Sequence, residues 1–153
     1  MNKKIIKWIL AILWMIFIFV MSTNIGSASN TIHVLKQITL KIPFIKVENL
    51  STEDKVLLLN MINFILRKSA HVGEYFILSI LLVSLVKEYE IKRNKIIFVV
   101  ISCSFIYATF DEIHQLFVIS RTGNTKDVIF DVLGAFFGTL ICFISYKKRL
   151  RSF

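Results

Sequence analysis

Residues 67–86 read RKSAHVGEYFILSILLVSLV, a charged, histidine-containing segment that passes directly into a long apolar run. Residues 75–86 contain no charged side chain, and with the preceding turns they are long enough to cross a membrane. Polar side chains recur every three or four residues in and before this segment, which is the spacing of one helix face; they are Asn60, Asn63, Arg67, His71 and Glu74. The pattern predicts a membrane-spanning helix that carries a polar stripe.

Three further apolar runs lie at residues 5–21, 96–118 and 128–146. Hydrophobic residues make up 56% of the 153-residue chain, which is more than soluble domains usually contain. We therefore predict an all-α integral membrane bundle of four transmembrane helices that forms a single domain over residues 1–153. The first run is longer than the apolar core of a signal peptide, so we expect a retained anchor.

The segment between the first two runs, residues 22–66, is the first loop. Residues 31–43 mix apolar and basic side chains, and one interpretation is an interfacial helix that lies along the membrane surface. Farther along, Ser51 or Thr52 is expected to cap the second helix, because acidic residues at positions 53 and 54 would lie in its first turn.

Basic residues are concentrated at the ends of the apolar runs. The chain has a net charge of +9, and its main basic groups are Lys3, Lys4 and Lys7; Lys87, Lys92, Arg93 and Lys95; and Lys147, Lys148, Arg149 and Arg151. Short basic flanks of this kind mark the cytoplasmic side of a membrane. The distribution predicts a multi-pass plasma-membrane protein with cytoplasmic N- and C-termini and no nucleic-acid partner.

The two cysteines, Cys103 and Cys142, lie inside apolar runs and far from any CxxC spacing. We interpret both as packing residues, so the sequence predicts neither a disulfide framework nor a zinc site.

Three of the predicted spans carry a carboxylate at a similar depth. At about 1.5 Å per residue, Glu74 lies about 18 Å along its helix from the cytoplasmic end, and Asp111 and Asp131 lie about 22 Å along theirs. Since the hydrocarbon core is about 30 Å thick, all three fall in one layer of its outer half. The polar side chains expected just above this layer are Arg67, Lys68, His71, His114, Gln115, Arg121 and Asp127.

A charged side chain that faces lipid at the helix centre costs about 2.5–3.5 kcal/mol, so these groups are expected to face one another. In the fourth span, Asp127, Asp131, Gly134 and Gly138 are spaced to share a face, and residues 134–138 form a GxxxG pattern. Small residues of this kind let helix backbones approach closely. The acidic face of the fourth span is therefore also predicted to be its packing face.

Residues 67–75, RKSAHVGEY, resemble the RK-x-x-H-x-x-E-Y segment of VanZ-like membrane proteins, and residues 111–117, DEIHQLF, are similar to their DE-x-HQ-x-F segment. The resemblance covers nearly the whole chain, with the first loop as the main departure. The resemblance continues in the expected order and spacing at Arg121, Asp127, Asp131 and Gly134. The first span, followed by Ser22, also fits the family. The resemblance implies a role in the envelope of Gram-positive bacteria like that of the family's founding member, which lowers susceptibility to the glycopeptide antibiotic teicoplanin.

The leading functional interpretation is a ligand-binding pocket in the outer leaflet. Its basic residues could engage the phosphates of a lipid-linked cell-wall precursor, and its acceptors could bind sugar or peptide groups. A glycopeptide is an alternative partner, membrane lipids surround the chain, and no resident cofactor is expected. The candidate pocket residues are Arg67, Lys68, His71, Glu74, Tyr75, Asp111, Glu112, His114, Gln115, Arg121, Asp127 and Asp131.

Two other interpretations stay open. His71 and Glu74 are spaced i, i+3, as are Asp111 and His114, so a metal-dependent membrane hydrolase is conceivable. However, the chain lacks HExxH and the arrangement expected of lipid phosphatases. Alternatively, the near-balanced acids and bases form a structural ion-pair network, and the bundle acts through a protein partner. A transporter is disfavoured because the sequence shows no repeat or broken helix.

Overall fold

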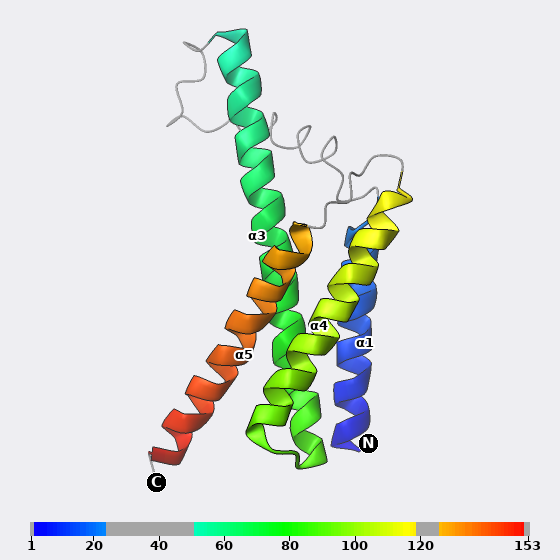
Figure 1. Cartoon of the computed structure of the whole chain (residues 1–153), viewed down its shortest axis with the longest axis vertical. Helices are drawn as coiled ribbons and strands as arrows, with labels where there is room; N and C mark the ends of the chain where they lie inside the picture. Colours follow the sequence, from blue (N-terminus) through cyan, green and yellow to red (C-terminus); the bar gives the residue numbers. More distant parts are fainter. Residues whose placement is uncertain (1, 24–50, 119–125, 152–153) are drawn as a thin grey trace.

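The computed structural model describes residues 2–23, 51–118 and 126–151, and these residues form helices without any strand. The elements are α1 (Lys3–Met21), α3 (Thr52–Val86), the short 3-10 helix η3 (Lys87–Tyr89), α4 (Arg93–Leu116) and α5 (Asp127–Arg151) (Figure 1). Four of these helices are long and apolar enough to cross a membrane. The structure thus confirms the predicted all-α bundle with four spans. The proposed interfacial helix at residues 31–43 lies outside the described residues.

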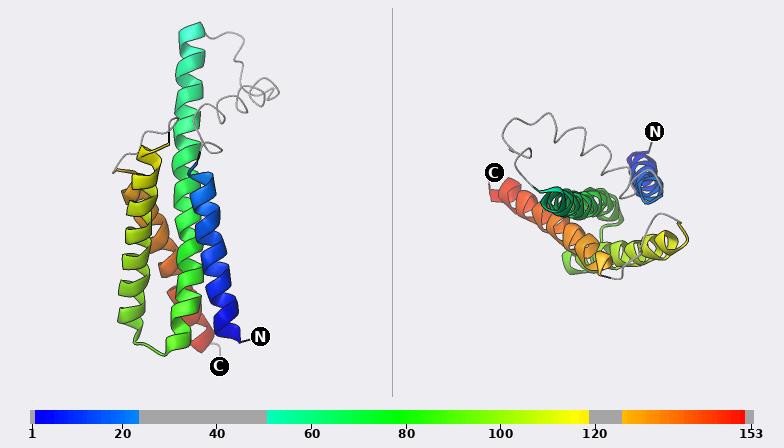
Figure 2. Two further views of the ribbon diagram at one scale, coloured as in Figure 1. Left: turned by 90° about the vertical axis from the view of Figure 1, so that its right-hand side faces the viewer. Right: turned by 90° about the horizontal axis from the view of Figure 1, so that it is seen from above.

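The four long helices alternate in direction along the bundle (Figure 1). The N-terminus, the α3–α4 connection and the C-terminus lie at the same end, here called the base. The opposite end, where α1 finishes at Met21 and α5 starts at Asp127, is called the far end. Helix α3 is the central element, since it packs against α1, α4 and α5 (Figure 2).

Helix α3 begins at a well-formed cap. The Ser51 side chain accepts a hydrogen bond of 3.1 Å from the backbone N–H of Asp54, and Glu53 and Asp54 occupy the first turn, where the helix dipole favours acidic residues. This confirms the expected N-terminus. At the base, α3 gives way to η3, which ends at Glu90 in the left-handed conformation with φ of 54°.

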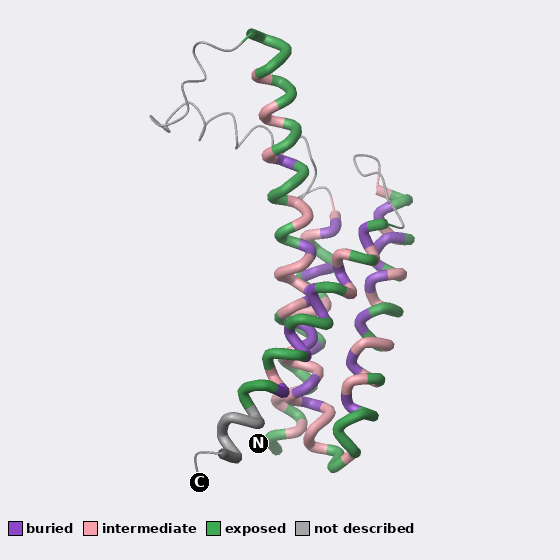
Figure 3. Tube along the Cα trace, turned by 60° about the vertical axis from the view of Figure 1, so that its left-hand side comes forward, coloured by how far each residue is buried: buried purple, intermediate pink, exposed green. Residues whose placement is uncertain are grey.

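The helix is much longer than the span expected at residues 67–86. Its 35 residues correspond to about 52 Å, whereas the hydrocarbon core is about 30 Å thick. The first turns of α3 extend past the other helices (Figure 1), and exposed residues predominate there (Figure 3). The other helices differ from the predicted spans by only a few residues at their ends.

The predicted packing face of α5 lies directly against α3. A Cβ added at Gly134 would come within 2.3 Å of the backbone oxygen of Val72, and one at Gly138 within 2.4 Å of the backbone oxygen of Phe76. The neighbouring Ala135 is fully buried as well. The two helix backbones therefore touch through the small residues, and this close contact fixes the height of the acidic residues of α5 beside α3.

At the base, side chains of α1 bind the end of α3 and the helix η3. The Lys7 ammonium pairs with the Glu88 carboxylate and donates a 3.0 Å hydrogen bond to the backbone oxygen of Ser84. Trp8 Nε1 donates a 2.9 Å hydrogen bond to the hydroxyl of Tyr89. These contacts hold the first helix against the turn that joins α3 to α4.

Gly134→Ala is expected to destabilise the bundle by about 1–3 kcal/mol, because the new methyl group must displace the backbone of α3. Gly73→Ala is the matched control, since a Cβ there would meet no atom within 4 Å. Gly73→Ala should leave the free energy of unfolding unchanged, or raise it by up to about 1 kcal/mol because alanine has the higher helix propensity. Reversible unfolding of both purified variants in mixed micelles measures the difference. Equal stability of the two variants would contradict the close α3–α5 contact.

Candidate functional site

The far half of the bundle contains a buried layer of polar side chains. On its α3–α5 side, the Lys68 ammonium pairs with the Asp127 carboxylate, and the side chains are only 15% and 5% exposed, respectively. About one helical turn nearer the base, His71 Nδ1 lies 3.2 Å from Oδ1 of Asp131. This second contact joins an imidazole nitrogen of α3 to a carboxylate oxygen of the fully buried Asp131. Both pairs join α3 to α5 just above the glycine contact.

The α1–α4 side of the layer is built by hydrogen bonds. Gln115 Nε2 donates to Oδ2 of Asp111 at 3.0 Å and to Oγ of Ser22 at 2.8 Å. The Tyr107 hydroxyl donates to the backbone oxygen of Met15 at 2.5 Å. These bonds position the Asp111 carboxylate against the end of α1.

The carboxylates expected in one layer do converge. Glu74, Asp111 and Asp131, from three different helices, all lie close enough to His71 to interact with it electrostatically. Asp111 and Asp131 also lie close enough to the buried Tyr75 side chain to interact with it electrostatically. The structure therefore confirms the predicted convergence. Whether these residues bind a ligand stays a prediction.

Several buried polar atoms of this layer have no hydrogen-bond partner within the described part of the chain. Asp131 is fully buried and its Oδ2 has no hydrogen-bond partner, while Oδ1 of Asp111 and Oε1 of Gln115 are unpartnered as well. The hydroxyl groups of Tyr75 and Ser104 also have no hydrogen-bond partner among the described residues. Buried polar groups nearly always have partners in folded proteins. The layer therefore holds buried acceptors and hydroxyl groups whose hydrogen-bonding capacity is not used within the described residues.

The remaining candidate residues lie around this layer. Arg67 is half-buried, and its Nε has no hydrogen-bond partner among the described residues. Glu112 is buried in α4, one position beyond Asp111. The His114 ring lies tilted against the ring of Phe19 in α1, with 4.2 Å between the ring centroids. Arg121 lies outside the described residues, so its expected place in the pocket stays a prediction.

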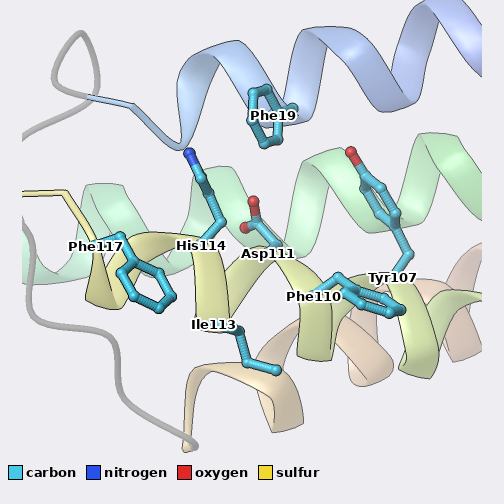
Figure 4. Close-up of a pocket in the computed structure, with 7 residues that line it drawn as sticks. All are labelled: Phe19, Tyr107, Phe110, Asp111, Ile113, His114 and Phe117. Atoms are coloured by element: carbon cyan, nitrogen blue, oxygen red, sulfur yellow. The ribbon is translucent and has the colours of Figure 1, made fainter.

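A cavity of about 260 Å³ lies between α1 and α4 beside the polar layer (Figure 4). It is lined by Phe19 of α1 and, in α4, by Tyr107, Phe110, Asp111, Ile113, His114 and Phe117, and its accessible lining is almost entirely apolar. Figure 4 shows the three polar side chains on the face of α4 that is turned toward α1.

The geometry gives the hydrolase interpretation no ready metal centre. Within residues 2–23, 51–118 and 126–151, no group of three or more His, Cys, Asp or Glu side chains is arranged to hold a metal ion. The close pairs are instead an ion pair, Lys68 with Asp127, and an imidazole–carboxyl contact, His71 with Asp131.

Sequence reasoning confined the pocket to the second, third and fourth spans, whereas α1 contributes to it directly. Trp14 Nε1 donates a 2.9 Å hydrogen bond to the backbone oxygen of Glu74, and Ser22 binds Gln115. In α4, the buried Ser104 was also missed. A signal existed for it, because Ser104, Asp111 and Gln115 share one helix face at spacings of 7 and 4 residues.

The fold and the buried layer define a multi-pass membrane protein with an intramembrane polar cluster shared by all four spans. A model of the VanZ/LLP1 family matches residues 7–146, so the chain belongs to this family. Searches of curated proteins and of solved structures find no match. The family match confirms the resemblance found in the motifs at residues 67–75 and 111–117.

Lys68→Met is expected to destabilise the bundle by about 3 kcal/mol or more, because it leaves the Asp127 carboxylate buried without its cation. Lys68→Met combined with Asp127→Leu should recover most of this loss. The matched control is the Lys7–Glu88 pair, whose side chains are 28% and 32% exposed and whose coupling should be below about 1 kcal/mol. Double-mutant cycles in mixed micelles give both coupling energies. Equal coupling at the two sites would show that burial of the Lys68 pair is unimportant.

Proposed function

We propose that this protein binds a lipid-linked or cell-wall-related ligand at the polar layer, in the outer half of the bacterial plasma membrane. One observation carries the proposal: the layer combines charged side chains with buried acceptor atoms that lack a hydrogen-bond partner among the described residues, above all Oδ2 of Asp131 and Oδ1 of Asp111. Ionisable groups inside a membrane are expensive and usually serve function.

The proposed location of the polar layer in the outer half of the membrane rests on the positive charge of the base. The base holds Lys3, Lys4 and Lys7 of α1, and it also holds the basic residues of the α3–α4 connection at positions 92, 93 and 95. Positive residues in short loops favour the cytoplasmic side. The base is then cytoplasmic, and the polar layer, which lies in the far half of the bundle, faces the cell wall.

The chemistry of the layer suits an amphiphile with a phosphate and a hydroxyl-rich or amide-rich head. Arg67 has a donor without a described partner, and an arginine can bind phosphate through two parallel hydrogen bonds. Arg121 is expected to be a second phosphate ligand. The unpartnered oxygens of Asp131 and Gln115 would accept hydrogen bonds from sugar hydroxyl or peptide N–H groups. Lipid-linked wall precursors combine all these groups.

The family resemblance also supports binding of a cell-wall-related ligand. The founding member of the family lowers susceptibility to teicoplanin, and this cell-envelope phenotype fits a protein that binds a wall intermediate outside the membrane. The competing interpretation is that the ion pairs only hold the helices in register. The two are separable, because a variant can keep the bundle stable and still change the charge of the layer.

The binding proposal is tested with purified protein in nanodiscs and a fluorescent lipid-linked disaccharide-pentapeptide pyrophosphate. Arg67→Gln should weaken its binding about tenfold or more, since a hydrogen bond to a charged group contributes about 1.5–3 kcal/mol. The stable pair variant Lys68→Met with Asp127→Leu should also lose affinity. The control is Lys92→Gln, which removes an exposed cation at the base.

Unchanged affinity in both layer variants would reject the proposal in favour of the structural ion-pair interpretation. A uniform loss that includes Lys92→Gln would show that the protein attracts the probe only through its overall charge.

The orientation is tested by cysteine labelling in intact cells. In a background with Cys103→Ala and Cys142→Ala, Thr52→Cys is expected to react with a membrane-impermeant maleimide, because the start of α3 would lie outside. Lys92→Cys at the base should react only after the cells are broken. The reversed pattern would place the polar layer in the inner leaflet.

A further inference from the structure

We propose that the base of the bundle binds the head group of an anionic phospholipid through Lys87 and Arg93, two cations that meet at the ring of Phe143. The site lies at the opposite end of the bundle from the polar layer, so it does not depend on the proposed binding of a wall-related ligand. One lipid molecule at the membrane surface would join the α3–α4 connection to the end of the α5 span.

The two cations come from different elements and lie at one aromatic ring of α5. The Lys87 ammonium of η3 is 5.5 Å from the centroid of the Phe143 ring, and the guanidinium carbon of Arg93 in α4 is 4.7 Å from it. Cations within about 6 Å of a ring centroid are attracted by the ring. Because both lie close to the same centroid, the two positive charges are no more than about 10 Å apart. One phosphate group between them can interact with both charges.

The charge of Arg93 is available to an external anion. It forms no ion pair with a carboxylate of the described residues. On the α1 side of the base the cations do meet a carboxylate, since Glu88 pairs with Lys7 and interacts electrostatically with Lys3 and Lys4. The positive charge of the α1 side is therefore partly neutralised within the chain, which makes the α5 side the better place for an anion from outside.

The stability of α4 does not explain why residue 93 is an arginine. Arg93 is the first residue of α4, where the helix dipole disfavours a positive charge, and the first turn contains no acidic residue. A positive residue at this position is unfavourable for its own helix, and a bound anion would offset this cost.

All three residues lie at the ends of apolar spans. Lys87 directly follows the last residue of α3, Val86, and Arg93 begins α4. Phe143 lies two residues before the apolar span of α5 ends at Ser145, a distance of about 3 Å along the helix. The site is therefore at the level of the lipid head groups, whichever side of the membrane the base faces. Basic pockets between transmembrane helices at this level bind anionic head groups.

Apolar side chains beside the ring favour a lipid over a soluble phosphate. Leu140 and Ile144 are close to Phe143 in α5, and they are 42% and 48% exposed in the isolated chain. In a bilayer such side chains contact acyl chains. Toward the base, α5 runs away from α3 and α4 (Figure 1). A phosphate bound by Lys87 and Arg93 could thus place its acyl chains along α5, whereas a soluble phosphate would leave this apolar surface unused.

The test is a titration of the full-length protein in detergent with dioleoylphosphatidylglycerol, followed by native mass spectrometry. We expect tighter binding of this lipid than of dioleoylphosphatidylcholine. Arg93→Gln should weaken its binding about tenfold, as expected for the loss of one charge-assisted hydrogen bond. This variant should fold, because it removes a cation that opposes the helix dipole. Lys87→Gln should also weaken binding, and Lys87→Arg, which keeps the charge, should retain it.

The matched control is Lys3→Gln combined with Lys4→Gln, compared with Lys87→Gln combined with Arg93→Gln. Both double variants remove two positive charges from the base, and Lys4, like the two proposed ligands, lies over an aromatic ring, that of Tyr89 at 4.2 Å. The control should change the affinity for the anionic lipid less than about twofold, whereas the site variant should lose the preference over phosphatidylcholine.

Four outcomes would overturn the proposal. Equal affinity of the wild-type protein for the two lipids would reject an anionic head group as the ligand. Unchanged binding in Arg93→Gln and Lys87→Gln would show that the cations only hold α5 against the base. An equal loss in the Lys3 and Lys4 control would reduce the effect to the overall charge of the base. Displacement of the lipid by millimolar glycerol 1-phosphate would assign the site to a soluble phosphate.

Discussion

The organisation of this protein depends on the cost of placing charged groups in hydrocarbon. A carboxylate at membrane depth cannot face lipid without a penalty of several kcal/mol, so each acidic residue must meet a polar partner inside the bundle. Asp127 and Asp131 meet Lys68 and His71 across the α3–α5 contact. Asp111 is reached by Gln115, which also binds the end of α1 through Ser22. The same requirement thus specifies which faces of the four helices point inward.

Close packing and polar pairing support each other on one side of the bundle. Gly134 and Gly138 bring the backbone of α5 onto α3, and the acidic residues lie one and two turns above this contact on the same face. Because the backbones are so close, the short Asp side chains can reach Lys68 and His71. Larger residues at the glycine positions would separate the helices and leave the buried carboxylates without their partners.

Much of the fold could be derived from the sequence, because the lipid environment imposes simple rules. Unbroken apolar runs, the recurrence of polar residues at helical spacing and the depth of Glu74, Asp111 and Asp131 predicted four helices and their shared layer. The length of α3 was underestimated, since the hydropathy of a span does not say how far a helix continues beyond the membrane. The contribution of α1 was missed for a different reason. Trp14 and Ser22 each make a single hydrogen bond, to α3 and α4 respectively, and a periodic sequence pattern does not predict such contacts.

The two sides of the polar layer differ in how tightly their helices pack. Between α3 and α5, small residues bring the two helix backbones into contact. Between α1 and α4 the contact is made by large rings, Phe19 with His114 and Tyr107 with the backbone of Met15, and rings in contact hold two helices apart. The space left between them is the cavity lined by Phe19 of α1 and by residues of α4. The bundle is therefore closed by direct backbone contact on its α3–α5 side and keeps an open space on its α1–α4 side.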